Sequence, residues 1–141
     1  MIRYKHFSTN LKDTLSFKGI YIIGEGPSSK NLSPEVAFVG TKSFDRLIRI
    51  LKLANIKISE VCMINLDRLP ELIYLMSESP FDPFIICCGN KVDKGMRKLR
   101  VDWTVKVNHP SPRNLYWNSA DSEKATAEFI KSRIPKNLLQ S

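Results

Sequence analysis

The chain of 141 residues lacks the long apolar segments that membrane insertion or secretion requires. No apolar run approaches the roughly 18 residues of a membrane-spanning helix, and the polar N-terminal segment has no apolar core of a signal peptide. We therefore expect a cytoplasmic protein without membrane association, and a nuclear or host-cell location stays open.

Cysteine is scarce, with three residues in the chain: Cys62, Cys87 and Cys88. The odd count and the adjacent pair argue against a disulfide framework and favour a reducing compartment. All three lie in apolar, strand-like segments, and their spacing does not suit a metal site. We expect buried structural thiols and no bound metal.

Acidic residues are in the minority, with 14 Asp and Glu against 22 Lys and Arg, which gives a formal charge of +8. Such an excess suits a polyanionic partner, above all nucleic acid, although a basic protein without such a partner can have the same composition. The length fits one monomeric domain over residues 1–141 with a sizeable core. No internal repeat or low-complexity segment divides it.

Short apolar runs alternate with amphipathic segments along the chain. Strands are expected over residues 19–23, 61–66, 84–88 and 103–107, because each run is short and apolar. Helices are expected near residues 44–51, 70–79 and 91–99, and a last one after Ser119 or Asp121, which can cap it.

Two of these helices have a readable buried face. In the first, the i, i+3, i+4, i+7 spacing predicts that the buried residues are Phe44, Leu47, Ile48 and Leu51. Its opposite, polar face includes Arg46 and Arg49, and Asn55 can end the helix. In the last helix the expected buried residues are Ala125, Phe129 and Ile130.

The alternation of strands and helices predicts one three-layer α/β/α domain around a central four-stranded parallel sheet. Right-handed crossovers place the carboxyl ends of all strands at one edge, where open α/β proteins bind ligands. The residues expected at that edge are Glu25, Phe38, Asn65, Asn90 and His109.

The most distinctive stretch follows the last expected strand and reads His109-Pro110-Ser111-Pro112-Arg113-Asn114. Its two prolines fix φ and bias the residues before them toward extended geometry, so the loop should be stiff. It would hold a histidine at a strand's carboxyl end beside a projecting arginine. An ordinary rigid turn explains the hexapeptide alone equally well.

Four short motifs together resemble the uracil-DNA glycosylase superfamily over about residues 20–120. GEGPS at 24–28 looks like the first motif, GQDPY in the commonest family and GEAPG in the thermophile-type family, and AFVG at 37–40 is similar to PFVG of the latter. MINL at 63–66 looks like the strand that carries a base-reading asparagine. HPSP at 109–112 matches the second catalytic motif, and its extension Arg113-Asn114 is close to the single-strand-selective family.

The resemblance implies a uracil-DNA glycosylase-like fold and a monofunctional DNA glycosylase. Such an enzyme flips uracil, or a related 5-substituted pyrimidine, out of single- or double-stranded DNA and hydrolyses its N-glycosidic bond, leaving an abasic site. Glu25 would orient the attacking water or offset the sugar's cationic character, and His109 would donate to the base O2 as negative charge develops. No cofactor is needed, and the motifs contain no lysine for a lyase reaction.

The resemblance also implies contacts to the base and to DNA. The expected base-binding residues are Gly24, Gly26, Phe38 and Asn65. Phe38 would stack on the pyrimidine, and the Asn65 amide would pair with uracil N3–H and O4 and reject cytosine. The alternative for Phe38 is a core residue. Without the other motifs, Asn65 is better explained as a turn former at the end of a strand.

The expected DNA contacts come from the two catalytic motifs and the residues after them: Ser28, Ser111, Arg113, Asn114, Tyr116 and Trp117. Arg113 would fill the gap that the flipped base leaves, or else contact a phosphate. Tyr116 and Trp117 would support it or stack on neighbouring bases.

Departures from the family motifs keep other functions open. Gly26 stands where the commonest family has aspartate, and Ser28 replaces the tyrosine that excludes thymine. The cluster-binding cysteines of the thermophile-type family have no counterparts. A catalytically weak or inactive DNA-binding, partner-recruiting module is therefore the first alternative. An α/β protein that acts on free nucleotides or nucleosides is the second, which the net charge disfavours.

Overall fold

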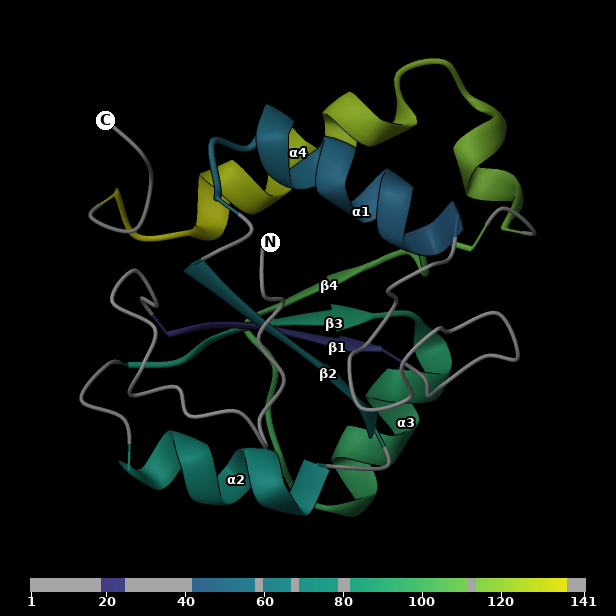
Figure 1. Cartoon of the computed structure of the whole chain (residues 1–141). Coiled ribbons are helices and arrows are strands. Elements are labelled where there is room, and N and C mark those ends of the chain that lie inside the picture. The colour runs from purple at the N-terminus through teal and green to yellow at the C-terminus, as the bar shows by residue number, and fades with distance from the viewer. Residues whose placement is uncertain are drawn as a thin grey trace.

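The computed structural model describes residues 19–24, 42–57, 60–66, 69–78, 82–111 and 114–136 of the chain. Four parallel strands form one sheet at its centre (Figure 1). The strands β1 (Ile20–Gly24), β2 (Val61–Asn65), β3 (Phe84–Cys88) and β4 (Val105–Val107) lie in the order β2-β1-β3-β4. All pairings are parallel, so the predicted four-stranded parallel sheet is confirmed.

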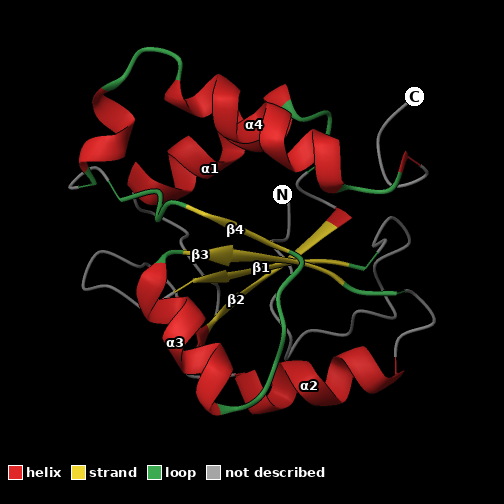
Figure 2. Ribbon diagram, turned by 180° about the vertical axis from the view of Figure 1, so that it is seen from behind, coloured by secondary structure: helices red, strands yellow, loops and turns green. Residues whose placement is uncertain are grey.

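Helices cover both faces of this sheet (Figures 1 and 2). On one face α1 (Lys42–Leu53) packs against α4 (Ser122–Arg133), and on the other lie α2 (Leu69–Glu78) and α3 (Asn90–Lys98). A short 3₁₀-helix, η4 (Leu115–Asn118), lies between β4 and α4 in the chain. The three-layer α/β/α architecture predicted from the sequence is therefore confirmed. None of the described helices has the length and apolar character of a membrane span.

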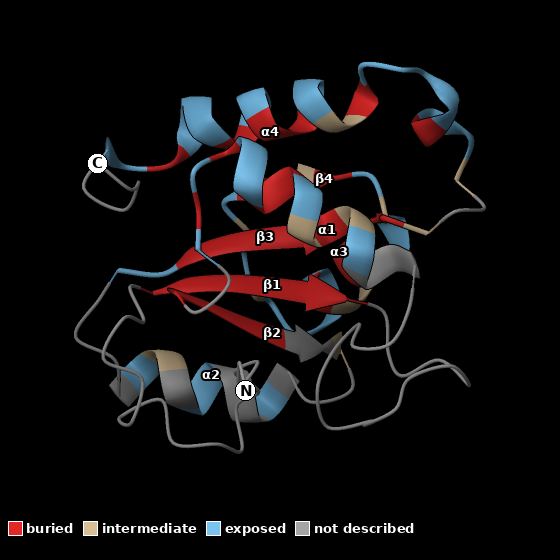
Figure 3. Cartoon of the chain, turned by 45° about the horizontal axis from the view of Figure 1, so that its top comes forward, coloured by how far each residue is buried: buried red, intermediate tan, exposed pale blue. Residues whose placement is uncertain are grey.

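The strands are buried on both faces, which explains their continuous apolar sequences. Ile20 and Ile22 of β1 belong to a core cluster that includes Leu47 of α1. Tyr21 and Ile23, on the other face, belong to a second cluster with residues of α3. Figure 3 shows β1 and β3 buried along their length, with exposed residues on the outer sides of the helices.

Two strands begin later than the sequence predicts. β4 begins at Val105 rather than at Trp103, because the Thr104 hydroxyl oxygen accepts the backbone N–H of Ile85 at 2.9 Å, in place of a regular ladder bond. β1 begins after Gly19, whose φ of 87° lies in the left-handed region rather than in the extended region of a strand.

The helix α1 largely follows its predicted pattern. Leu47 and Leu51 are buried and Ile48 is half-buried, while the side chain of Phe44 lies outside the described part of the structure. Asn55 follows the helix with φ of 60°, which confirms it as the residue that ends α1. The helices α2 and α3 lie within one residue of their predicted ranges.

The buried face of α4 differs from the prediction. Ile130 is buried as expected, but Ala125 is exposed and Phe129 is 39% exposed. Thr126 is instead turned inward and is 6% exposed. This polar residue is tolerated there because its hydroxyl donates to the Ser122 carbonyl at 2.9 Å. The prediction failed because it counted only apolar residues as candidates for burial.

The three cysteines are buried, as predicted, and each is 0% exposed. Burial raises the pKa of the Cys62 thiol to about 12 and that of the Cys87 thiol to about 12, and it raises the pKa of Cys88 as well. Such thiols stay protonated and are poor nucleophiles and poor metal ligands. Within the described residues, no group of three or more His, Cys, Asp or Glu side chains is placed to hold a metal ion.

We expect the native chain to resist alkylation by iodoacetamide at mildly alkaline pH, because its thiols are both protonated and inaccessible. Unfolding the chain in guanidinium should release all three thiols for rapid reaction. Mass spectrometry of the labelled protein measures both states. Rapid labelling of any cysteine in the folded chain would contradict the burial described here.

Candidate functional site

The carboxyl ends of the strands meet at one edge of the sheet. There Gly24 of β1 is the register partner of Asn65 of β2. In the other half of the sheet, β3 ends at Cys88 beside Val107 of β4. The structure thus brings Gly24, Asn65 and the segment that leads to His109 to the same edge, although the Asn65 side chain lies outside the described part.

A cavity of about 270 Å³ opens where β3 and β4 end. Its lining residues come from the start of α3, from β4 and from the loop that follows β4: Gly89, Asn90, Lys106, Val107, Asn108, His109 and Asn114. The volume lies near the lower end of the range for small-ligand sites, roughly 300–1,000 Å³. His109 and Asn114, the first and last residues of the distinctive hexapeptide, therefore both line a space of ligand size.

The wall of this cavity depends on a glycine. Gly89 has φ of 99° and ψ of 171°, and its N–H donates to the Val107 carbonyl at 3.0 Å. A Cβ at this position would lie 3.0 Å from the His109 Cβ. Only glycine combines this backbone conformation with so close an approach, so Gly89 allows α3 to begin directly beside His109.

The His109 ring is held by its own loop. The Ser111 backbone N–H donates to His109 Nδ1 at 3.0 Å. Because Nδ1 accepts this hydrogen bond, the neutral ring carries its proton on Nε2, and Nε2 is the hydrogen-bond donor. The loop between two prolines thus fixes both the orientation and the tautomer of the histidine.

The backbone of the same loop is anchored from η4. Trp117 Nε1 donates to the His109 carbonyl at 2.7 Å, and Asn114 Nδ2 donates to the same oxygen at 3.4 Å. The Asn114 side-chain oxygen also accepts the Tyr116 N–H at 3.0 Å, which caps η4. Trp117 is 8% exposed and belongs to the core, so this anchor is rigid.

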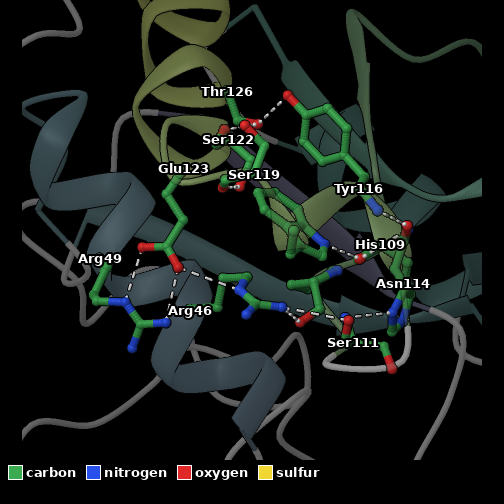
Figure 4. Close-up of polar contacts among 12 residues, drawn as sticks. Arg46, Arg49, His109, Ser111, Asn114, Tyr116, Ser119, Ser122, Glu123 and Thr126 are labelled. Carbon is green, nitrogen blue, oxygen red and sulfur yellow. Dashed lines mark hydrogen bonds and ion pairs between the residues drawn. The ribbon is translucent and has the colours of Figure 1, made fainter.

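Arg46 of α1 connects this loop to the helical layer (Figure 4). Its Nη1 donates to the carbonyls of Pro110 at 3.3 Å and Ser111 at 3.4 Å. Its Nε forms an ion pair with Glu123 of α4 at 3.2 Å, and its guanidinium carbon lies 5.0 Å from the centre of the Trp117 ring. One arginine therefore joins α1, α4 and the loop of the candidate site.

A second polar network lies behind the cavity and centres on Asp93 of α3, which is 7% exposed. Its carboxylate accepts hydrogen bonds from Trp103 Nε1 at 2.8 Å, Arg97 Nε at 3.0 Å and Lys106 Nζ at 3.4 Å. The hydrogen bond from Trp103, followed by that from Arg97, lowers the pKa of Asp93. One carboxylate thus faces two cations, which leaves a net positive charge beside the cavity.

The remaining residues predicted for the site fall into two groups. Outside the described residues lie Glu25, Gly26, Ser28, Phe38 and Arg113. Their roles, and the pairing of Glu25 with His109, stay predictions. Among the described residues Tyr116 is 39% exposed, and Trp117 is 8% exposed and donates to the His109 carbonyl. Their expected roles toward DNA stay predictions.

The sequence analysis missed three residues of the site. It assigned Arg46 to the solvent-facing side of α1, which is wrong, because that side chain is 18% exposed and bound to the loop. Glu123 is 77 residues away from it, and no local pattern predicts such a pair. For Lys106 the sequence did contain a signal. A charged residue between two buried valines of a strand indicates a polar environment beside that strand.

No protein-family model matches this chain, and neither a curated protein nor a solved structure matches it.

We expect Glu123→Gln to destabilise the chain by about 1–3 kcal/mol at neutral pH, because it weakens charged hydrogen bonds to two arginines. The hydrogen bond from Arg49, followed by that from Arg46, lowers the pKa of Glu123 in the folded state. This stabilisation is present above the unfolded pKa of about 4.3 and is lost as the pH falls through the folded pKa.

Thermal unfolding of wild type and Glu123→Gln across this pH range provides the measurement. The gap in melting temperature should be widest near neutral pH and shrink in acid. Glu128→Gln, an exposed position on the same helix, is the matched control and should show no such gap. A gap that persists unchanged in acid would mean that the carboxylate charge is not responsible.

We expect Gly89→Ala to destabilise the chain by about 1–3 kcal/mol, the usual magnitude for a side chain in this backbone region. The new methyl group would also press on the His109 Cβ and shift the ring. Denaturant unfolding measures the first effect, and the imidazole resonances of His109 report the second. Gly95→Ala in α3 is a comparison without a positive φ, where the added carbon meets the end of the flexible Leu66 side chain. If Gly89→Ala matches wild type both in denaturant unfolding and in the imidazole resonances of His109, glycine is not required at position 89.

Proposed function

We propose that this protein is a monofunctional DNA glycosylase that hydrolyses the N-glycosidic bond of uracil or a related pyrimidine in DNA. The observation that carries this proposal is the hydrogen bond from the Ser111 N–H to His109 Nδ1 at 3.0 Å. It makes Nε2 the donor of a histidine that lines a cavity at the carboxyl edge of a parallel sheet. A donor fixed in this way can stabilise the negative charge that develops on a departing uracil.

The chemistry follows from charge development during bond cleavage. As the bond between sugar and base breaks, negative charge accumulates on the base, including its O2, and the sugar becomes cationic. A donor held in place beforehand stabilises this state more than the ground state, because it needs no reorganisation. In this proposal His109 donates to O2, and Glu25 orients the water that attacks the sugar.

The hydrogen bonds around the loop support this role. The His109 carbonyl is held by Trp117, and the next two carbonyls are held by Arg46. These contacts fix the backbone on both sides of the ring, so that the donor keeps its place when the base enters. Phe38 and Asn65 would stack on and read that base, as the resemblance of their segments implies.

The position of Lys106 bears on the choice between a glycosylase and a lyase. Its Nζ lies beside the cavity, where an amine could attack the C1′ carbon of an abasic sugar. In the structure Nζ donates to the Asp93 carboxylate at 3.4 Å, so this amine is engaged by a carboxylate. Its engagement there supports a monofunctional reaction with water as the nucleophile.

We expect His109→Ala and Glu25→Gln each to lower single-turnover excision by roughly a hundred- to ten-thousand-fold, the usual range for lost acid/base or electrostatic assistance. Affinity for uracil-containing DNA should change little. Alkaline cleavage of a labelled oligonucleotide with one uracil measures excision, and Glu128→Gln is the matched control for the acidic position.

Three results would reject the assignment in different ways. Excision at the wild-type rate in both variants would remove the two residues from catalysis. Tight DNA binding by wild type without any excision, on uracil and on 5-hydroxymethyluracil, would favour the inactive DNA-binding module. Hydrolysis of free deoxyuridine in place of the oligonucleotide would indicate a nucleoside-hydrolysing protein.

A further inference from the structure

The positive charge of the chain is concentrated next to the cavity. Residues 90–106 contain six basic and two acidic residues, which is half of the net charge of +8 in about an eighth of the chain. The basic residues are Lys91, Lys94, Arg97, Lys98, Arg100 and Lys106. Of the two acidic residues, Asp93 is buried and already bound to two of these cations.

Three of these lysines form a row on the outer side of α3. Lys91, Lys94 and Lys98 are exposed and follow the i, i+3, i+7 spacing of one helix face. The buried side of the helix, which includes Val92 and Met96, points the opposite way. We call these three lysines the α3 basic row. It extends over about 10 Å of the helix axis, given a rise of about 1.5 Å per residue.

The α3 basic row begins at the cavity. Asn90, the first residue of α3, lines the cavity, and Lys91 follows it directly. The row then continues away from the carboxyl edge of the sheet, in the direction in which α3 extends from the end of β3 (Figure 2). Lys106 adds a further cation on the cavity wall.

The lysines of the α3 basic row differ from Arg46 and Arg49 of α1 in how their charge is neutralised. In α1 Arg46 and Arg49 both pair with Glu123. The lysines of the α3 basic row form no ion pair with any other residue in the part of the chain that the structure describes. Like charges at i, i+3 and i, i+4 destabilise a helix, and a bound polyanion would remove this repulsion.

We propose that the α3 basic row binds the phosphate backbone of the DNA strand whose flipped nucleotide occupies the cavity. This inference rests on the proposed function for the identity of the polyanion. Neighbouring phosphates of one DNA strand are about 3.4 Å apart along the axis and farther apart along the winding backbone, so a row of about 10 Å is long enough to contact about two of them. Such contacts position the strand and are independent of its sequence.

The test replaces the row in one variant, Lys91→Gln, Lys94→Gln and Lys98→Gln together. Its matched control carries Lys124→Gln, Lys131→Gln and Lys136→Gln, three exposed lysines in or just after α4, the helix on the other face of the sheet. Both variants lose the same charge, so a difference between them reports location rather than net charge. A third variant with arginine at 91, 94 and 98 keeps the charge of the row.

The measurement is fluorescence anisotropy with labelled uracil-free duplex DNA at several salt concentrations. For the row variant we expect at least about tenfold weaker binding at low salt, and a log–log salt slope reduced by about 0.9 per lost phosphate contact. The control and the arginine variant should stay close to wild type. Equal losses in the row variant and the control, or no loss in either, would overturn the proposal.

Because uracil-free DNA is used, this result does not depend on excision. If wild type shows no excision but the row variant alone loses DNA affinity, phosphate binding by the row is supported and the catalytic assignment is rejected. If excision is intact and binding by the row variant is unchanged, the row falls and the catalytic assignment stands. Melting curves check folding, and the row variant should melt no lower than wild type, since repulsion is removed. If the row variant does not fold, the double variant Lys94→Gln and Lys98→Gln replaces it in the comparison with wild type and the control.

Discussion

The ion pair between Arg46 and Glu123 is the interaction on which the geometry of the candidate site depends. It joins two helices that pack on the same face of the sheet, and Nη1 of the same guanidinium donates to the carbonyls of Pro110 and Ser111. A half-buried arginine must keep all its partners, because an unpaired charge there is unfavourable. The position of His109 is therefore set by α1 and α4 as much as by the prolines beside it.

The sheet was predictable from the sequence because strands that are buried on both faces have continuous apolar runs, as in residues 20–23 and 84–88. The first residue of β4 was not predictable. Thr104 is a good strand former, but its hydroxyl oxygen accepts the Ile85 N–H in place of a backbone carbonyl. The inward position of Thr126 was missed for a related reason, because its hydroxyl is satisfied within its own helix. In both cases a side-chain hydrogen bond, which a hydrophobic pattern does not record, decided the outcome.

The candidate site was predictable where its chemistry is local. The hexapeptide that begins at His109 is visible in a few adjacent letters. The capping role of Asn114 was not predicted, because this residue was expected only as a DNA contact. The contributions of Arg46 and Lys106 were not predicted either, because they depend on which elements meet in three dimensions. Arg46 lies 64 residues from Pro110, and Lys106 gains its meaning only from the cavity beside β4. The roles of Glu25 and Phe38, read from the same kind of local motif, stay predictions.

The position of β4 at the outside of the described sheet gives Lys106 a second effect, on association with other chains. In the described sheet β4 is an outer strand, only three residues long, and Lys106 is its middle residue. Outer strands expose unpaired backbone groups that can recruit another chain, and short strands with a lysine are a common protection against such association. The cation beside the cavity thus also lowers the tendency of the sheet to extend into aggregates. Any change that made this position less basic would therefore weaken the protection of the sheet against association as well as alter the charge of the cavity wall.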